Sequence, residues 1–353
     1  MRMMRSDSRA RRFSPVALLA LLALVALTPV LRAGAQDATP AATVTPYEAP
    51  ENVGDLEGSI EVDGSSTVAP ITGAVAEDFQ EVAPNVQVSV GVSGTGGGFE
   101  RFCNGETDIA DASRPIEDEE AALCAENGVE YYRFEVAFDG ITIVVNKNNT
   151  ALTCISVESL ANLWTEGSDV TTFADLGEGL PDEEISLYGP GPDSGTFDFF
   201  NEVILGDDVA PRTDYTPSED DNVLVEGVAG DENALGYFGY AYFTENQDQL
   251  NAVAVTTESD LSNCVTPSLE TIANGTYQPL SRPIYIYVKA ESLTRPEVQE
   301  FLRFYIANTG TLSEDVGYVA APAADYAGAQ EKLEGAISGT VQPDSAAAAT
   351  PES

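Results

Sequence analysis

Three short segments of the chain place small hydroxyl side chains beside glycine. They are residues 63–67 (DGSST), 93–98 (SGTGGG) and 193–196 (DSGT). In such segments backbone N–H groups and hydroxyl groups can point the same way at close range. This arrangement suits a small oxyanion, particularly where the loop opens a helix. One loop of this kind is usually an ordinary turn. Three of them, spread along the chain, predict one composite anion pocket.

The residue types that the chain lacks restrict the chemistry of this pocket. There is no histidine, which excludes Ser–His–Asp and Cys–His catalysis, histidine general bases and histidine-ligated zinc. The four cysteines show no C-x-x-C spacing, so a thiolate zinc or redox site is not expected. We therefore expect no metal, no cofactor and no catalytic residues.

The charge of the chain restricts its partners. It carries 16 basic and 58 acidic residues, a formal net charge of −42. Such a protein repels nucleic acid and anionic membrane surfaces, so neither is expected as a partner. We interpret most of the carboxylates as a solubility or high-salt adaptation. Because the overall field opposes an anion, local dipoles and hydrogen bonds must hold the ligand.

The elements that must position these loops alternate between strand-like and helix-like stretches. The length of 353 residues fits two lobes plus tails, and the alternation is typical of α/β layers around a mainly parallel sheet. In such sheets ligands bind where the carboxyl ends of strands lead into helices, and each hydroxyl loop follows an expected strand. The pattern predicts strands at 59–62, 86–92, 140–145, 185–188 and 284–288, and helices at 68–82, 99–104, 157–164, 196–205 and 297–308.

The two ends of the chain are typical of an exported protein. Residues 1–35 combine an arginine-rich leader, an apolar run at 16–27 and small residues at 33–35, which predicts a signal peptide cleaved near Ala35. The apolar run is too short for a comfortable membrane span. Residues 36–56 and 338–353 are rich in small residues and proline, and we expect a flexible linker and a disordered tail there.

Export makes disulfides plausible. Four cysteines allow three pairings, which the sequence leaves open. Sequential pairing, Cys103–Cys124 and Cys154–Cys264, would keep each bridge inside one lobe. The alternative is four free buried thiols.

Several motifs resemble one family along most of the chain. They lie at residues 63–73, 92–117, 188–201 and 217–244, and the likeness continues through 282–289 and 315–322. Over roughly residues 57–337 the chain resembles the phosphate-binding component of phosphate-specific ABC transporters, the PstS-type solute-binding proteins. The resemblance implies a two-lobed, Venus-flytrap α/β fold of the type II periplasmic-binding-protein kind. It also implies capture of inorganic phosphate outside the membrane, delivery to an ABC permease, a periplasmic or cell-surface location, and action as a monomer.

The resemblance also assigns roles to residues. The phosphate-binding positions would be Ser66, Thr67, Thr95, Ser113, Arg114, Ser194, Gly195 and Thr196. Some members of the family have a proton-accepting aspartate where this chain has Ser113 and Arg114. Other members place an arginine shortly before the SGT loop, where this chain has residues 189–191 (GPG). We infer that Arg114 takes the guanidinium role, although it could instead pair with a neighbouring carboxylate. The proton acceptor is then open among Asp111, Asp193 and Asp221.

Other functions and the division into lobes stay open to test. The pocket could take sulfate, molybdate or arsenate, or the protein could sense phosphate. A phosphatase that uses Ser194 is a remote alternative, because its segment lacks a G-x-S-x-G elbow. We expect lobe 1 to comprise residues 57–137 and 283–337, and lobe 2 residues 138–282, with crossings near 138–139 and 281–282.

Overall fold

The structure of this chain is a computed structural model that describes residues 43–206 and 208–344. The expected signal peptide lies outside these ranges. The described residues form one compact unit. Within the described ranges, no helix is both long and apolar enough to cross a bilayer.

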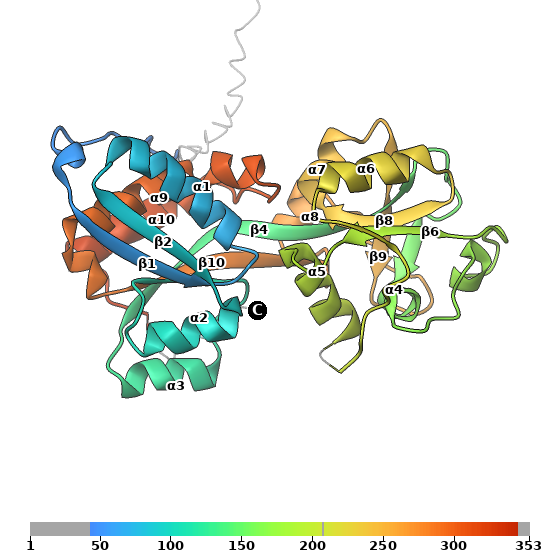
Figure 1. The fold of residues 1–353 in the computed structure, drawn as a ribbon, viewed down its shortest axis with the longest axis horizontal. Coiled ribbons are helices and arrows are strands. Elements are labelled where there is room, and N and C mark those ends of the chain that lie inside the picture. The colour runs from blue at the N-terminus through green and yellow to red at the C-terminus, as the bar shows by residue number, and fades with distance from the viewer. Residues whose placement is uncertain (1–42, 207, 345–353) are drawn as a thin grey trace, which may run out of the picture. The chain divides into compact units, whose positions relative to one another are not determined.

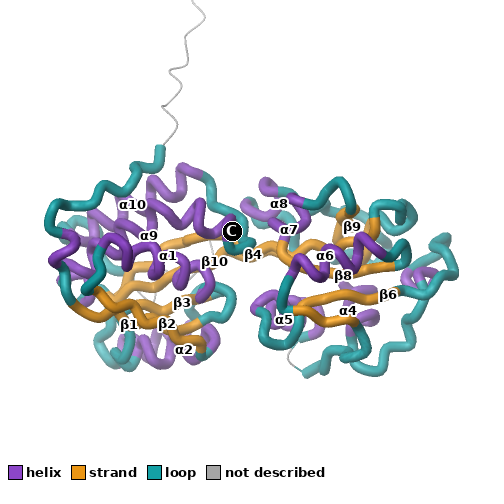
Figure 2. The backbone as a smooth tube through the Cα atoms, turned by 45° about the horizontal axis from the view of Figure 1, so that its top comes forward, coloured by secondary structure: helices purple, strands orange, loops and turns teal. Residues whose placement is uncertain are grey.

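Two long antiparallel strands join the two halves of this unit (Figure 1, Figure 2). They are β4 (Tyr131–Asn146) and β10 (Ser281–Lys289), which pair along the whole length of β10. The main path of strands runs β2-β1-β3-β10-β4-β8-β6-β7, while β9 pairs with β4 and β5 pairs with β9. The expected two-lobed α/β fold is confirmed.

The first lobe covers both faces of its sheet with helices. The strands β1 (Gly58–Gly64), β2 (Val86–Val92) and β3 (Ile109–Ala112) run parallel, with β1 in the middle. One face packs against α1 (Ala69–Val82), α9 (Pro296–Asp315) and α10 (Ala323–Ile337). The other face packs against α2 (Gly94–Cys103) and α3 (Asp118–Glu126). The loops that leave β1 and β2 therefore lead directly into α1 and α2, at the same edge of the sheet.

The second lobe repeats this arrangement on the other half of β4. Here β8 (Ala234–Gly239) pairs antiparallel with β4 and parallel with β6 (Ser186–Pro190), which pairs with β7 (Thr216–Ser218). A parallel pair, β5 (Cys154–Ser156) and β9 (Leu250–Thr256), extends the sheet. Its helices are α4 (Val157–Trp164), α5 (Gly195–Phe200), α6 (Asp221–Gly230), α7 (Tyr240–Glu245) and α8 (Leu269–Ala273), and a π-helical turn, Asn201–Leu205, follows α5.

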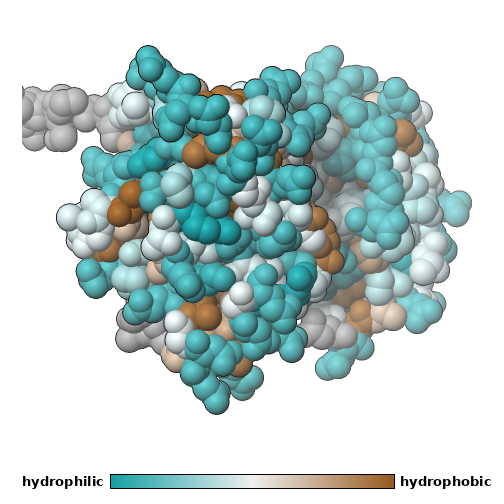
Figure 3. Space-filling model, turned by 60° about the vertical axis from the view of Figure 1, so that its left-hand side comes forward, coloured by the Kyte–Doolittle hydropathy of each residue, from teal (hydrophilic) through white to brown (hydrophobic). Residues whose placement is uncertain are grey.

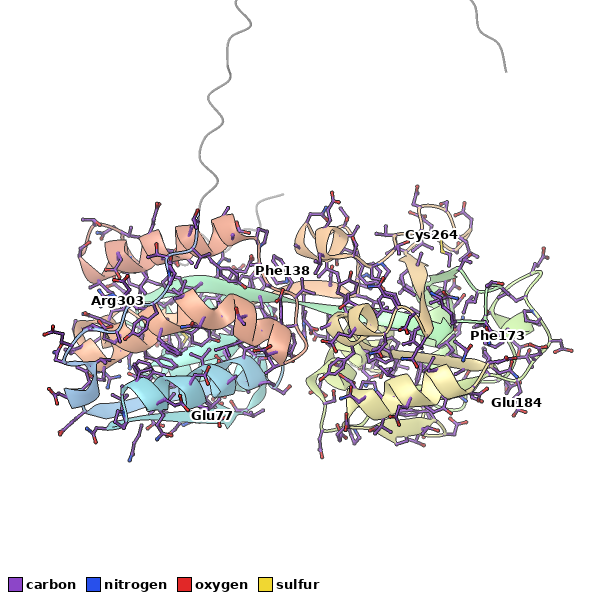
Figure 4. The ribbon with its side chains drawn as sticks, turned by 90° about the horizontal axis from the view of Figure 1, so that it is seen from above. Glu77, Phe138, Phe173, Glu184, Cys264 and Arg303 are labelled. Carbon is purple, nitrogen blue, oxygen red and sulfur yellow. A yellow bond between two sulfur atoms is a disulfide. The ribbon has the colours of Figure 1, made fainter. Side chains whose placement is uncertain are left out.

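The chain passes between the two hydrophobic cores inside β4 and just inside the start of β10. Ala137 belongs to the first core and Phe138 to the second, and Figure 4 shows Phe138 at the passage between the lobes. On the return, Leu280 packs in the second core and Ile284 in the first. Part of the segment 283–337, which we expected in lobe 1, also packs in the second core. Val319, Ala321 and Tyr326 pack in the second core because the α9–α10 connection returns to Phe138, whose N–H donates to Val319 O at 2.8 Å.

Described residues of the expected linker and tail contact the first lobe. Tyr47 packs edge-on against Phe304 with ring centroids 5.2 Å apart, and Val53 is buried in the first core. At the other end, the N–H of Asp344 donates to Tyr131 O at 2.8 Å, and its carboxylate pairs with Lys332 at 2.8 Å. The composition of these two segments predicted flexibility because a single apolar or charged residue among small residues produces no periodic pattern in the sequence.

Both disulfides follow the sequential pairing and lie inside one lobe each. Cys103–Cys124 joins α2 to α3, and Cys154–Cys264 joins β5 to the segment after β9. No cysteine is free.

Removing the longer bridge should cost more stability than removing the shorter one. The sequence separations are 110 and 21 residues, and a longer closed loop restricts the unfolded chain more. We expect alanine at both cysteines to lower the free energy of unfolding by about 5 kcal/mol for Cys154–Cys264 and about 3 kcal/mol for Cys103–Cys124. Urea unfolding of each double variant measures this difference. Free thiols in the denatured, unreduced wild type would contradict the pairing.

Candidate functional site

A cavity of about 190 Å³ lies where three loops of lobe 1 meet a helix of lobe 2 and the start of β10. The loops follow β1, β2 and β3, and the helix is α5 with its π-helical extension. The lining side chains are hydroxyls, glycines, two arginines and two carboxylates. They belong to Ser65, Ser66, Thr67, Gly94, Thr95, Gly96, Ser113, Arg114, Asp198, Glu202 and Arg282.

The loop after β1 is held tightly against β3. Ser65 N–H donates to Asp111 O at 2.9 Å, and Thr67 N–H donates to Ser65 Oγ at 3.2 Å. Gly64 has φ of +149°, and a Cβ there would lie 2.1 Å from Asp111 O. Only glycine fits this position, because any side chain would collide with the backbone of β3. The close approach places the hydroxyls of Ser66 and Thr67 at the cavity.

The loops after β2 and β3 are joined by their hydroxyl groups. Thr95 Oγ1 lies 3.0 Å from Ser113 Oγ and accepts the Ser113 N–H at 3.2 Å. Asp63 accepts hydrogen bonds from Ser93 Oγ and from Arg101, which fixes the start of α2 against β1. Five of the expected binding residues, Ser66, Thr67, Thr95, Ser113 and Arg114, are therefore brought together at one cavity.

Arg114 reaches the cavity while it pairs with carboxylates of its own lobe. Its Nη1 and Nη2 both donate to Glu120 at 2.8 Å, and its Nε lies 3.3 Å from Glu117. The hydrogen bonds to Glu120 are the main reason that the pKa of Arg114 is raised. The alternative expectation of ion pairing is thus part of the structure, with glutamates as partners. Glu120 holds the guanidinium on the cavity wall.

The SGT loop of lobe 2 lies against the first loop but behind the cavity lining. Ser194 caps α5 by accepting the Thr196 N–H at 3.2 Å. A Cβ on Gly195 would lie 3.0 Å from the Thr67 Cα, so Gly195 allows the two loops to touch. The side chains of this element that line the cavity are Asp198 and Glu202, which follow the SGT loop in the chain. Asp198 accepts a hydrogen bond from Ser66 Oγ at 3.3 Å, and partial burial raises the pKa of Asp198.

Arg282 is one of three charged lining residues, with Asp198 and Glu202, that the sequence analysis did not predict. Its Nη2 donates to Thr67 Oγ1 at 3.0 Å, its Nη1 donates to Glu202 Oε2 at 3.1 Å, and its guanidinium lies 3.7 Å from the centroid of the Phe199 ring. Its Nε is 3.4 Å from Asp139 Oδ2, which makes an ion pair without hydrogen-bond geometry. Asp139 faces Arg282 across the β4–β10 pair. The sequence did offer one indication. Arg282 is one of few basic residues in a very acidic chain, and it lies where we expected the chain to pass between the lobes.

The three carboxylates expected as proton acceptors do not line this cavity, and their role stays a prediction. Asp111 is buried in lobe 1, where its Oδ1 accepts from Thr72 Oγ1 at 3.0 Å. Asp193 is exposed, and its N–H donates to Glu219 at 3.4 Å. Asp221 begins α6, where burial raises its pKa to about 7. None of the three lines the cavity, whereas Asp198 and Glu202 do.

Asp111 should make the stability of the protein depend on pH. Burial raises its pKa from 3.8 to about 8, although the Thr72 hydrogen bond acts in the opposite direction. The folded protein then keeps a proton that the unfolded chain releases. Asp111 therefore contributes stability that is complete below about pH 4 and is lost as the pH rises towards about 8.

Asparagine in place of Asp111 should flatten this dependence. The amide has the shape of the protonated carboxyl and does not titrate. We expect Asp111→Asn to reduce the loss of unfolding free energy between about pH 5 and about pH 8 by more than 1 kcal/mol, roughly. Urea unfolding at both pH values, with Asp193→Asn as an exposed control, measures the effect. An equal pH dependence in both variants would show that Asp111 ionises normally.

Comparisons with known proteins agree with this architecture. A family model described as a PBP superfamily domain matches residues 35–309. The chain is 45% identical to Protein SphX of Synechococcus elongatus over 284 residues, which cover 80% of this chain and 83% of that protein. It is 39% identical to the phosphate-binding protein PstS of Staphylococcus saprophyticus over 287 residues, 80% of this chain and 87% of that protein. The crystal structure of a possible phosphate-binding protein from Planctomyces limnophilus matches with a TM-score of 0.74 and 44% identity, over 81% of this chain and all of that chain.

Proposed function

The chain belongs to the PBP superfamily as a PstS-type phosphate-binding protein, and we propose that it captures inorganic phosphate and delivers it to an ABC permease. The observation that carries this proposal is the convergence of hydroxyl loops and two guanidinium groups on one cavity. Hydroxyl and guanidinium groups are the donors that hold a tetrahedral oxyanion. The cavity of about 190 Å³ is smaller than the 300–1,000 Å³, approximately, of pockets for drug-sized ligands.

We assign the donors as follows. Ser66, Thr67, Thr95 and Ser113 would donate from lobe 1, and Arg114 and Arg282 would supply the positive charge. Ser194, Gly195 and Thr196 would support the Thr67 loop from lobe 2. Asp198 is the carboxylate that would accept the hydrogen bond from the proton that phosphate keeps at neutral pH. The Ser66 hydroxyl, which now donates to Asp198, can turn towards the ligand.

Calorimetric titration of the purified mature protein with phosphate tests the proposal. We expect saturable binding with one site per chain, and weaker binding of sulfate, because sulfate has no proton to donate to Asp198. Molybdate and arsenate complete the series of tetrahedral anions. Preferential binding of sulfate or molybdate would assign the cavity to another oxyanion, and no binding of any of them would contradict the proposal.

The leader-like sequence of residues 1–35 and the acidic composition are the features that support an exported binding protein. Figure 3 shows a largely hydrophilic face on which hydrophobic side chains are scattered, in keeping with the acidic composition. We propose that the protein acts as a monomer in the periplasm or at the cell surface, after cleavage near Ala35. Mass spectrometry of the secreted protein and light scattering test these two points.

A phosphatase remains the remote alternative. In the structure Ser194 Oγ accepts the Thr196 N–H, which is the role of a helix cap. The chain has no histidine to activate this hydroxyl. Release of p-nitrophenol from its phosphate ester by the pure protein would favour the enzyme over the binding protein.

A further inference from the structure

The Glu202 carboxylate is an anion that the protein itself places in the cavity. Its Oε2 accepts the hydrogen bond from Arg282 Nη1 at 3.1 Å, and it lines the cavity together with both arginines. The side chain of Glu202 is 53% exposed, whereas that of Arg282 is 13% exposed. The pair therefore joins a fixed guanidinium to a hydrated carboxylate that can leave it.

The charge of Glu202 also reaches the second guanidinium. The pKa of Arg114 is raised mainly by hydrogen bonds to Glu120, and the negative charge of Glu202 adds to this. Arg114 and Arg282 come from different parts of the fold, one from the loop after β3 and one from β10. Glu202 therefore interacts with both guanidinium groups. An oxyanion bound by the same two groups would lie in the same region of the cavity.

The position of Glu202 has a cost for the fold. Asp198 and Glu202 are four residues apart on α5 and its extension, so two like charges share one side of the helix. Such a pair is destabilising rather than stabilising. Burial is the main cause that raises the pKa of Asp198, and the negative charge of Glu202 also raises it. The two carboxylates therefore interact. The repulsion between them opposes placing both at the cavity.

The other contacts of Arg282 limit the directions from which an oxyanion can reach its guanidinium group. Nη2 donates to Thr67, Nε faces Asp139, and one face of the guanidinium covers Phe199. A tetrahedral oxyanion that takes two parallel hydrogen bonds from this group must use the edge formed by Nη1 and Nη2. Glu202 Oε2 accepts a hydrogen bond from Nη1, one of the two nitrogens of that edge, and a second anion beside it would be repelled.

We propose that Glu202 is a built-in competitor that holds Arg282 in exchange with the phosphate ligand. This inference rests on the proposed function of the cavity. Phosphate must displace the carboxylate to bind, and the carboxylate returns to the guanidinium when phosphate leaves. Glu202 therefore weakens affinity and speeds release. A protein that hands its ligand to a permease gains from faster release.

The test compares two substitutions of Glu202. Glu202→Gln removes the charge, and Glu202→Asp keeps the charge but is one methylene too short to hold Nη1 from the same backbone position. We expect both to lower the phosphate dissociation constant by about fivefold to twentyfold in calorimetry, which is at and below the lower end for a charged hydrogen bond because the carboxylate is half exposed. Release of radiolabelled phosphate in a chase with unlabelled phosphate should slow by a similar factor. Glu226→Gln, which removes an exposed charge from α6 in the same lobe, should change neither value.

The outcomes separate competition from simpler roles. Tighter binding in Glu202→Gln but not in Glu202→Asp would show general repulsion and overturn the proposal. Unchanged or weaker binding in both would show that Glu202 is neutral or supports the ligand, and would also overturn it. In an Arg282→Lys background, the gain from Glu202→Gln should disappear, because lysine offers no two-nitrogen edge. If the wild type binds no phosphate at all, the proposed function of the cavity fails first, and this failure is seen before any variant is compared.

Discussion

Replacement of Arg282 by methionine should raise the phosphate dissociation constant by about a hundredfold or more. A charged hydrogen bond in a partly desolvated site contributes about 1.5–3 kcal/mol, and Arg282 offers two of them together with its charge. Methionine keeps an unbranched apolar stem, so the loss reports the guanidinium, including its contact with the Phe199 ring. Calorimetric titration with phosphate measures the change. Arg303→Met is the matched control, because Arg303 pairs with Glu300 and Glu334 on α9 and α10 and does not line the cavity.

The folded state of this variant needs its own check. Asp139 is 4% exposed and loses its partner when Arg282 is replaced, although burial already raises its pKa and favours the neutral form. Arg282→Lys keeps a positive charge near Asp139 but loses the planar fork. We expect it to retain the wild-type melting temperature within a few degrees and still to lose about tenfold in affinity. If Arg282→Met and Arg303→Met bind phosphate equally well, Arg282 is only a structural partner of Asp139.

Arg114 allows a comparison within the same site. Its loss in Arg114→Ala should cost about 2 kcal/mol or more of phosphate binding. Because Glu120 and Glu117 already share its charge, we expect a smaller effect than at Arg282. Calorimetry ranks the two variants directly. If Arg114→Ala lost more phosphate affinity than Arg282→Met, Arg114 would be the main guanidinium ligand, as the sequence alone suggested.

The hydroxyl loops could be located from the sequence because their chemistry is local. Glycine beside serine or threonine after a strand defines a donor-rich loop whatever the rest of the chain does, and the loops after β1 and β2 do line one cavity. Arg282 could not be located in this way. Its position depends on the antiparallel register that sets it opposite Asp139, and this register joins segments more than 140 residues apart.

Which carboxylates line the cavity could not be predicted, for a related reason. Asp111 stands next to Ala112 and Ser113, so the sequence placed it near the anion. Alternation along β3 instead points it into lobe 1, towards Thr72 and Tyr305. Asp198 and Glu202 lay on the expected helix 196–205. Which side of that helix faces lobe 1 follows from the packing of Gly195 against Thr67, a contact between segments far apart in the chain.

Replacement of Asp198 by asparagine should narrow the preference for phosphate over sulfate by at least about tenfold. The two anions have the same shape, so the protein must distinguish them by the proton that phosphate keeps at neutral pH. A carboxylate can accept a hydrogen bond from that proton, but it meets sulfate with lone pairs only. An unmatched buried polar contact costs about 1–3 kcal/mol, and more when it is charged. Asparagine can offer an N–H to either anion, so sulfate should bind more tightly to the variant while phosphate binds less tightly.

Competition calorimetry with both anions at neutral pH measures this preference, and the variants of the other candidate carboxylates are the controls. Asp193→Asn and Asp221→Asn remove the same charge from the same lobe without altering the cavity lining, so both should keep the wild-type preference. The melting temperature of Asp198→Asn should stay close to that of the wild type, because its bond from Ser66 is long, at 3.3 Å, and solvent-exposed. If Asp221→Asn instead loses the preference, the proton acceptor reaches the ligand from α6. If none of the three asparagine variants loses the preference for phosphate over sulfate, the arginines are responsible for it, and Glu202 is the next carboxylate to replace.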